Sequence, residues 1–126
     1  MLSILKQDLL DLLDYARECH PNEVFVLLRG DRKGEKLKVK EFLTPPFSVG
    51  GRGFASFRPH LLPIDFSVIG TAHSHPAGPP RPSMTDLTNF YSRVMLIVAA
   101  PYRIQDVAAY NKRGEQVHVE AVDKFE

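Results

Sequence analysis

The run Phe66–His73 (FSVIGTAH) constrains the fold of this 126-residue chain more than any other stretch. It is almost wholly apolar or β-branched, which predicts a buried β-strand. A second histidine, His75, follows, and then Pro76 and Gly78–Pro80 stop the strand and turn the chain. Residues two apart in a strand point to the same face, about 6.5 Å apart. Both imidazoles are therefore expected on one side of the end of the strand.

The stretch after this turn, Ser83-x-x-Asp86, opens a predicted helix over Ser83–Arg93. Asp86 then lies in the first helical turn, from which its carboxylate can return to an ion held by His73 and His75. Two histidines and one aspartate are the ligand set of a catalytic zinc site, which leaves one coordination position open for water. The same spacing also fits a helix cap, with Ser83 as N-cap and Asp86 favoured by the helix dipole. The two interpretations are compatible.

The rest of the chain predicts a single domain of mixed α/β (α+β) class, with helices packed on a sheet. An amphipathic helix is expected over Ile4–Cys19, because apolar residues recur there at intervals of three and four. A Pro- and Gly-rich loop is expected over Thr44–Gly53, followed by a short strand at Phe54–Phe57. Further strands are expected at Glu23–Arg29, Lys36–Leu43, Val94–Ala100, Ile104–Tyr110 and Glu115–Val122.

Composition excludes several classes of protein. The net charge is +1, which gives no electrostatic case for a nucleic acid or an anionic membrane as partner. The apolar run Val94–Pro101 is far shorter than the roughly 20 residues of a membrane span. The first residues show no basic segment before an apolar core, so no signal peptide is expected. Cys19, the single cysteine, cannot form an internal disulfide, which suits a reducing cytoplasm; if exposed, it could join two chains in a homodimer.

The spacing His73-Ser74-His75, seven residues, then Ser83-x-x-Asp86 resembles the metal motif of the JAMM (MPN-plus) zinc metalloproteases. That family carries a glutamate upstream, on the first strand after the first helix, and Glu23 stands in the corresponding place. The resemblance covers most of the chain, whose compact length is similar to that of archaeal and bacterial members. It implies a curved, mostly antiparallel sheet flanked by helices, of the MPN/JAB (cytidine-deaminase-like) type.

The resemblance also implies an activity and a role for each residue of the motif. The activity is hydrolysis of the isopeptide bond after the C-terminal Gly-Gly of a ubiquitin-like modifier conjugated to lysine. His73, His75 and Asp86 would bind one Zn²⁺ per chain, and Glu23 would act as general base. Ser83 would stabilise the oxyanion. Ser74 points to the opposite face from the histidines and is expected to bond within the sheet.

Three other functions stay open on the sequence. The chain could process linear precursors of ubiquitin-like sulfur-carrier proteins, or serve as a non-catalytic scaffold, although a scaffold predicts missing ligands. A small-molecule zinc deaminase typically supplies a Pro-Cys-x-x-Cys stretch, which this sequence lacks. A Gly-Gly tail would be held most simply by strand addition, with the Thr44–Gly53 loop over it and Phe54–Phe57 as the edge.

Overall fold

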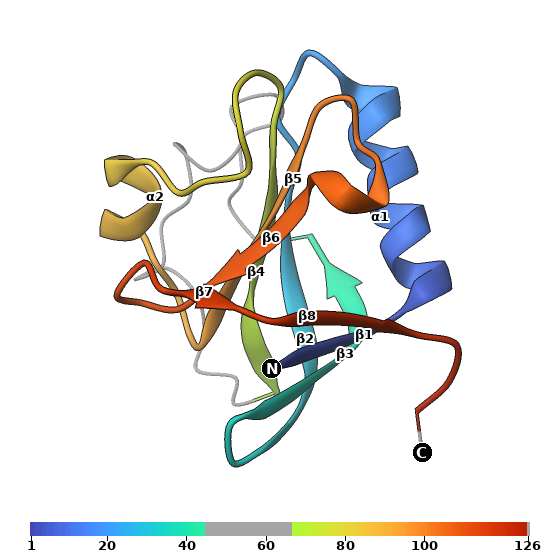
Figure 1. Cartoon of the computed structure of the whole chain (residues 1–126), viewed down its shortest axis with the longest axis vertical. Coiled ribbons are helices and arrows are strands. Elements are labelled where there is room, and N and C mark those ends of the chain that lie inside the picture. Colours follow the sequence, from blue (N-terminus) through green and yellow to red (C-terminus); the bar gives the residue numbers. More distant parts are fainter. Residues whose placement is uncertain (45–66, 126) are drawn as a thin grey trace.

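The computed structural model describes residues 1–44 and 67–125. Most of the predicted Thr44–Gly53 loop and the whole predicted strand Phe54–Phe57 lie outside the described residues. Two α-helices, a 3-10 turn and eight strands make up the described part (Figure 1). In chain order they are β1 (Leu2–Leu5), α1 (Lys6–Cys19), β2 (Phe25–Lys33), β3 (Lys36–Leu43), β4 (Val68–His75), α2 (Met84–Thr88), β5 (Val94–Ala99), the 3-10 turn η3 (Ile104–Asp106), β6 (Val107–Tyr110), β7 (Gln116–Val117) and β8 (Val119–Val122).

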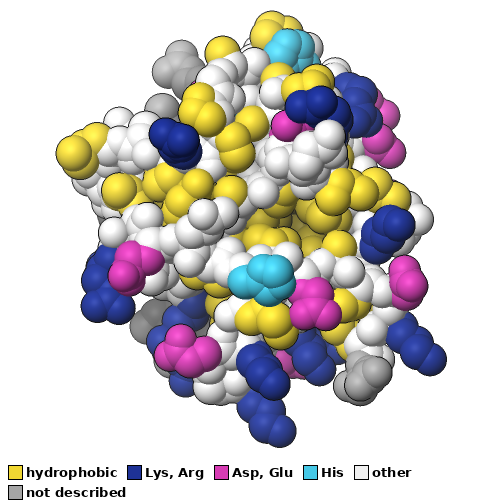
Figure 2. Space-filling model, in the orientation of Figure 1, with side chains coloured by type: hydrophobic (Ala, Val, Ile, Leu, Met, Phe, Trp, Pro, Cys, Tyr) yellow, Lys and Arg dark blue, Asp and Glu magenta, His cyan; other side chains and the backbone are white. Residues whose placement is uncertain are grey.

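All eight strands belong to one sheet, in the order β7-β6-β5-β4-β2-β3-β1-β8. Four of the pairs among the described strands are antiparallel (β2–β3, β2–β4, β5–β6, β6–β7) and three are parallel (β1–β3, β1–β8, β4–β5). The two outermost strands, β7 and β8, are separated in the chain by His118 alone. The sheet therefore curves until it nearly closes. Figure 2 shows hydrophobic side chains in the recess beside β8, where the open edges face each other.

The first strand is the largest difference from the sequence prediction. The predicted helix over Ile4–Cys19 begins only at Lys6, because Leu2–Leu5 pair in parallel with both β3 and β8. Leu2 and Ile4 are fully buried as a result. Leucines at helical spacing continue back into this segment, so the local pattern predicts a helix there. The segment is a strand because it pairs with residues more than 30 positions away in the chain. The single helix of that region, α1, has 14 residues, and no helix among the described residues is long and apolar enough to cross a membrane.

Other boundaries move by shorter distances. The strand Lys36–Leu43 is confirmed as β3. The strand predicted at Glu23–Arg29 begins instead at Phe25 and continues to Lys33, which leaves only Gly34 and Glu35 in the turn between the two strands. The helix predicted to reach Arg93 ends at Thr88. The predicted strand Ile104–Tyr110 opens with a 3-10 turn, and the final strand is divided at His118.

Two apolar clusters lie on opposite faces of the sheet. The larger one joins α1 to the sheet through Leu9, Leu12, Leu13 and Ala16, which come from one side of the helix. The smaller one includes Phe25 of β2 and Ile97 of β5. His73 of β4 stands directly between these two residues in the register of the sheet. Since cross-strand neighbours share a face, the His73 side chain lies on the side of the sheet away from α1.

Replacement of Gly70 by alanine is expected to destabilise the fold by about 3 kcal/mol, through overpacking in the central strand. A Cβ at this position would lie 2.2 Å from the carbonyl oxygen of Val94 and 2.6 Å from its Cγ1, so β4 and β5 would have to separate. Urea denaturation at fixed zinc concentration measures the change in the free energy of unfolding.

Gly34→Ala is the matched control for Gly70→Ala. Gly34 has a φ of +62° in the β2–β3 turn, and a Cβ added there would meet no atom within 4 Å. Its replacement by alanine should lower the free energy of unfolding by only about 1 kcal/mol, because alanine must adopt a left-handed backbone conformation there. Equal losses in the two variants would contradict a steric role for Gly70.

Candidate metal centre

The end of β4 presents two histidines on the same face of the sheet. His73 is only 1% exposed, and His75 is the last residue of the strand, with 18% of its side chain exposed. The alternation expected from the sequence is thus confirmed. Pro76 and the residues that follow it carry the chain away from the sheet, so the His75 ring lies at the border between the core and solvent.

Asp86 reaches these histidines from the first turn of α2. Its backbone N–H donates to Ser83 Oγ at 3.0 Å, and the Ser83 N–H donates to Asp86 Oδ2 at 2.9 Å. This reciprocal pair is the capping box that the Ser-x-x-Asp spacing predicts. Because the box fixes the Asp86 side chain, it also aims Oδ2 at the two imidazoles. The cap and the cluster are therefore made by the same residues.

Three ligand atoms converge at this point. His73 Nε2 and His75 Nε2 lie 3.2 Å apart, and Asp86 Oδ2 lies 3.3 Å from the first and 3.1 Å from the second. Ligands at 2.0–2.1 Å from a tetrahedral zinc ion are separated by about 3.3–3.4 Å. The triangle fits one face of such a tetrahedron to within about 0.2 Å. The donor set, two imidazoles and one carboxylate, suits Zn²⁺ as well.

A second contact sets which nitrogen of His75 is free to bind. His75 Nδ1 lies 3.1 Å from the carbonyl oxygen of Pro79, which can only accept a hydrogen bond. Nδ1 therefore donates in this contact, and Nε2 is the nitrogen that faces Asp86 and would bind a metal ion. The neighbouring carbonyl, that of Pro80, accepts a bond from the hydroxyl of Tyr110 at 2.8 Å. Tyr110 thus fixes the loop that orients His75, a role for which the sequence offers no signal.

The charges in the cluster support each other. Burial raises the pKa of Asp86, but hydrogen bonds with His73 and His75 lower it by a larger amount. The resulting pKa lies well below the usual range for a carboxyl group. The hydrogen bond to Asp86 raises the pKa of His75 against the effect of burial. The lowered pKa favours the ionised form of Asp86, which is the form that binds a metal ion.

Glu23 lies two residues before β2, in a segment joined to β4. The Val24 N–H donates to Ser74 Oγ at 2.9 Å, and the Ser74 N–H donates to the Val24 carbonyl at 3.1 Å. The Glu23 side chain is exposed, and its negative charge contributes to the raised pKa of His75. The pairing of this segment with β4 continues toward the end of that strand, where Glu23 and His75 lie on neighbouring chain segments. The structure also confirms that Ser74 bonds within the sheet.

Tyr102 holds the same segment from its other end, a contact that the sequence did not reveal. The Tyr102 hydroxyl lies 2.7 Å from His20 Nδ1, and the tyrosine is only 2% exposed. Arg17 donates to the Tyr102 carbonyl at 2.8 Å. The segment that carries Glu23 is thus fixed at His20 and again at Val24.

Replacement of Ser74 by alanine is expected to cost about 1–3 kcal/mol of folding free energy, because it leaves the buried Val24 N–H without its acceptor. Ser3→Ala is the control, because Ser3 is another buried serine of the sheet and is not the acceptor of the Val24 N–H. Thermal and urea unfolding of the zinc-loaded proteins compare the two. A Ser74→Ala protein as stable as Ser3→Ala would show that this hydrogen bond contributes nothing.

Comparisons with known proteins agree with this geometry. The family model of prokaryotic homologs of the JAB domain matches residues 5–111. A probable metalloprotease of Haloferax volcanii is 39% identical to this chain. The alignment covers 90% of this chain and 77% of the relative.

Two solved structures share the fold. A JAB1/MPN domain protein from Archaeoglobus fulgidus is 33% identical, with a TM-score of 0.71 over 95% of this chain and 98% of the other. A second, described as JAMM, a metalloprotease-like zinc site in the proteasome and signalosome, is 30% identical, with a TM-score of 0.70 over 97% and 98% of the two chains. The chain belongs to the family of prokaryotic JAB-domain proteins and is a zinc metalloprotease.

Proposed function

We propose that this metalloprotease is an isopeptidase that cleaves the bond after the C-terminal Gly-Gly of ubiquitin-like modifiers attached to lysine. The observation that carries the proposal is the triangle of His73 Nε2, His75 Nε2 and Asp86 Oδ2, with the Glu23 charge beside it. In this proposal the three residues hold one zinc ion per chain. Zinc in such a centre supplies Lewis acidity, which makes water a nucleophile near neutral pH.

Glu23 is proposed as the general base. An exposed carboxylate is ionised at neutral pH and can accept a proton from the attacking water. The same carboxyl then donates that proton to the lysine amine as it leaves. Attachment of its segment at both His20 and Val24 supports this role, because proton transfer requires a base held within hydrogen-bond reach.

Ser83 is proposed to stabilise the oxyanion of the tetrahedral intermediate. Its Oγ accepts from the Asp86 N–H, which leaves the hydroxyl proton free to donate to a substrate oxygen. The capping role and the catalytic role therefore use different parts of one hydroxyl group. Ser83 is exposed, as contact with a substrate requires.

A protein substrate is supported by the surface around the cluster. Met84 follows Ser83 directly and is 81% exposed. Exposed methionines adapt to irregular partner surfaces. A slim Gly-Gly tail suits a site whose ligands come from the end of a strand and the start of a short helix. That the enzyme works in the cytoplasm, and as a homodimer, remains a prediction.

The test is cleavage of a ubiquitin-like modifier joined to a lysine side chain, followed by mass spectrometry of the products. Zinc-loaded protein should release the modifier with its terminal Gly-Gly intact, and chelated protein should not. A linear precursor with residues after its Gly-Gly forms the second arm. Cleavage of the linear substrate alone would favour sulfur-carrier processing. Failure on both substrates, with one zinc bound per chain, would contradict the Gly-Gly specificity while leaving the metal centre intact.

A further inference from the structure

The curved sheet has a second opening, at the end opposite the metal centre. β4 and β5 run parallel, so that His75 lies at one end of the pair and Arg93, just before β5, lies at the other. The Arg93 N–H donates to the carbonyl of Ile69 at 3.0 Å. Six residues separate Ile69 from His75 along β4, about 20 Å of extended strand. Any ligand in this opening is therefore remote from the proposed chemistry.

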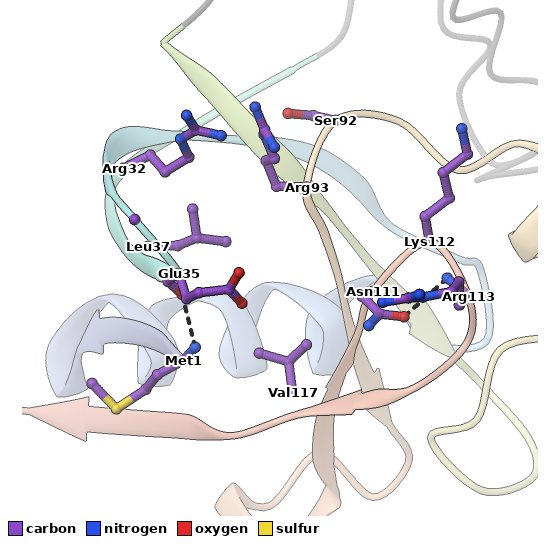
Figure 3. A pocket seen from close by; sticks show the side chains of 11 residues that line it. Met1, Arg32, Glu35, Leu37, Ser92, Arg93, Asn111, Lys112, Arg113 and Val117 are labelled. Atoms are coloured by element: carbon purple, nitrogen blue, oxygen red, sulfur yellow. Dashed lines mark hydrogen bonds between the residues drawn. The ribbon is translucent and has the colours of Figure 1, made fainter.

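A cavity of about 380 Å³ fills this opening. Four segments surround it: Met1 before β1, the β2–β3 hairpin, the residues before β5, and the β6–β7 turn with β7 itself (Figure 3). Leu37 and Val117 supply apolar surface in its lower part, and Arg32, Arg93 and Lys112 stand at its upper rim. We call these five residues the cationic mouth. The volume lies in the range of small-molecule sites, which prefer positions such as the mouths of barrels.

The charges at the rim are unbalanced. Arg32, Arg93 and Lys112 come from three different segments, and none of them makes an ion pair with a carboxylate of residues 1–44 or 67–125. A fourth cation, Arg113, is paired with Glu115 at 3.1 Å. Glu35 is the acidic residue that lines the cavity, and it offsets one of these charges. The whole chain carries only +1, so this local excess is not a property of the average surface.

Hydrogen bonds fix the turns that carry Arg93 and Lys112. Ser92 has a φ of +68°, a left-handed conformation that is strained for a non-glycine residue. Its hydroxyl donates to the Val68 carbonyl at 2.8 Å, and this bond secures the turn from which Arg93 projects. On the other side, Asn111 Oδ1 accepts from the N–H groups of Arg113 and Glu115, which fixes the turn that carries Lys112. Side chains on fixed turns lose less freedom when a ligand binds.

We propose that the cationic mouth binds a small polyanion that carries two or more phosphate or carboxylate groups. Guanidinium groups bind such groups through paired, charge-assisted hydrogen bonds. Arg32 and Arg93 stand together and Lys112 stands apart from them, so a ligand with two anionic groups can engage both sides (Figure 3). The apolar surface of Leu37 and Val117 accommodates the carbon skeleton between them. The anionic groups can belong to a free metabolite or to the acidic side chains of a protein segment.

The test is isothermal titration of the zinc-loaded protein at low salt with three probes: inorganic tripolyphosphate, citrate and a hexaglutamate peptide. Arg93→Gln and Lys112→Gln should each weaken binding about 10-fold, the loss expected for one charged hydrogen-bond donor. Lys6→Gln, an exposed cation on α1, should change binding less than about 2-fold and serves as the charge-matched control. Heat from contact with zinc is common to all variants, so the difference between them reports the mouth alone.

Binding of tripolyphosphate or citrate with this pattern identifies a free anion, and binding of hexaglutamate alone identifies an acidic protein segment. Both results support the site. Equal affinity in wild type, Arg93→Gln and Lys6→Gln, or no binding of any probe, would overturn it. Peptide-bond cleavage is not the readout, so the outcome is independent of the proposed isopeptidase activity.

Discussion

Replacement of Glu23 by glutamine is expected to lower kcat about 10²- to 10⁴-fold, the contribution typical of a general base. The amide keeps the size and shape of the carboxyl but cannot accept a proton at neutral pH. The zinc content and the free energy of unfolding should stay at wild-type values, because Glu23 is exposed and its segment is held by backbone and side-chain bonds at His20 and Val24. Single-turnover cleavage of the Gly-Gly conjugate, with metal analysis of the same samples, measures both quantities.

Glu18→Gln provides the matched control for this experiment. Glu18 is another exposed glutamate, near the end of α1, and its substitution changes the net charge equally without touching the cluster. It should leave kcat within a factor of about two. A Glu23→Gln enzyme with wild-type kcat would remove Glu23 from the mechanism, and the search for a base would turn to other groups around the metal centre.

Replacement of Asp86 by asparagine is expected to weaken zinc binding by more than about 100-fold, because loss of even an indirect partner of a metal ligand commonly costs 10- to 100-fold. Asp86 Oδ2 is the only anionic atom of the three that converge, so its loss leaves two neutral imidazoles. Activity should fall with metal occupancy. Zinc also stabilises the native state by mass action, by about 4 kcal/mol at a thousandfold excess over its dissociation constant. Asp86→Asn should lose that increment.

Competition with a fluorescent zinc chelator gives the affinity, and thermal unfolding with and without zinc gives the stabilisation. Asp123→Asn, an exposed aspartate near the C-terminal end of the chain, is the control and should behave as wild type. Asparagine at position 86 keeps a side-chain acceptor for the Ser83 N–H, so the cap of α2 should survive. A variant that binds zinc as tightly as wild type would exclude Asp86 from the ligand set.

The sequence alone determined the local parts of the metal centre. Alternation along β4 places His73 and His75 on one face, because the period of a strand is two wherever the strand lies. The Ser-x-x-Asp spacing predicts the capping box of α2, which depends on bonds within four residues. The apolar face of α1 and the bounds of β3 follow from periodicity in the same way. Each of these features is set by neighbours in the chain.

Only the tertiary structure decided the features that depend on distant partners. Leu2–Leu5 became a strand because β3 and β8 lie on either side of it, although the leucine spacing there continues that of a helix. The segment that carries Glu23 is held beside β4 by the bond between Val24 and Ser74, 50 residues apart in the chain. The cationic mouth gathers Arg32, Arg93 and Lys112 from three separate segments only when the sheet curves. Local preferences leave several conformations of such segments close in energy, and pairing with distant residues determines which one forms. A single sequence does not show directly which residues pair.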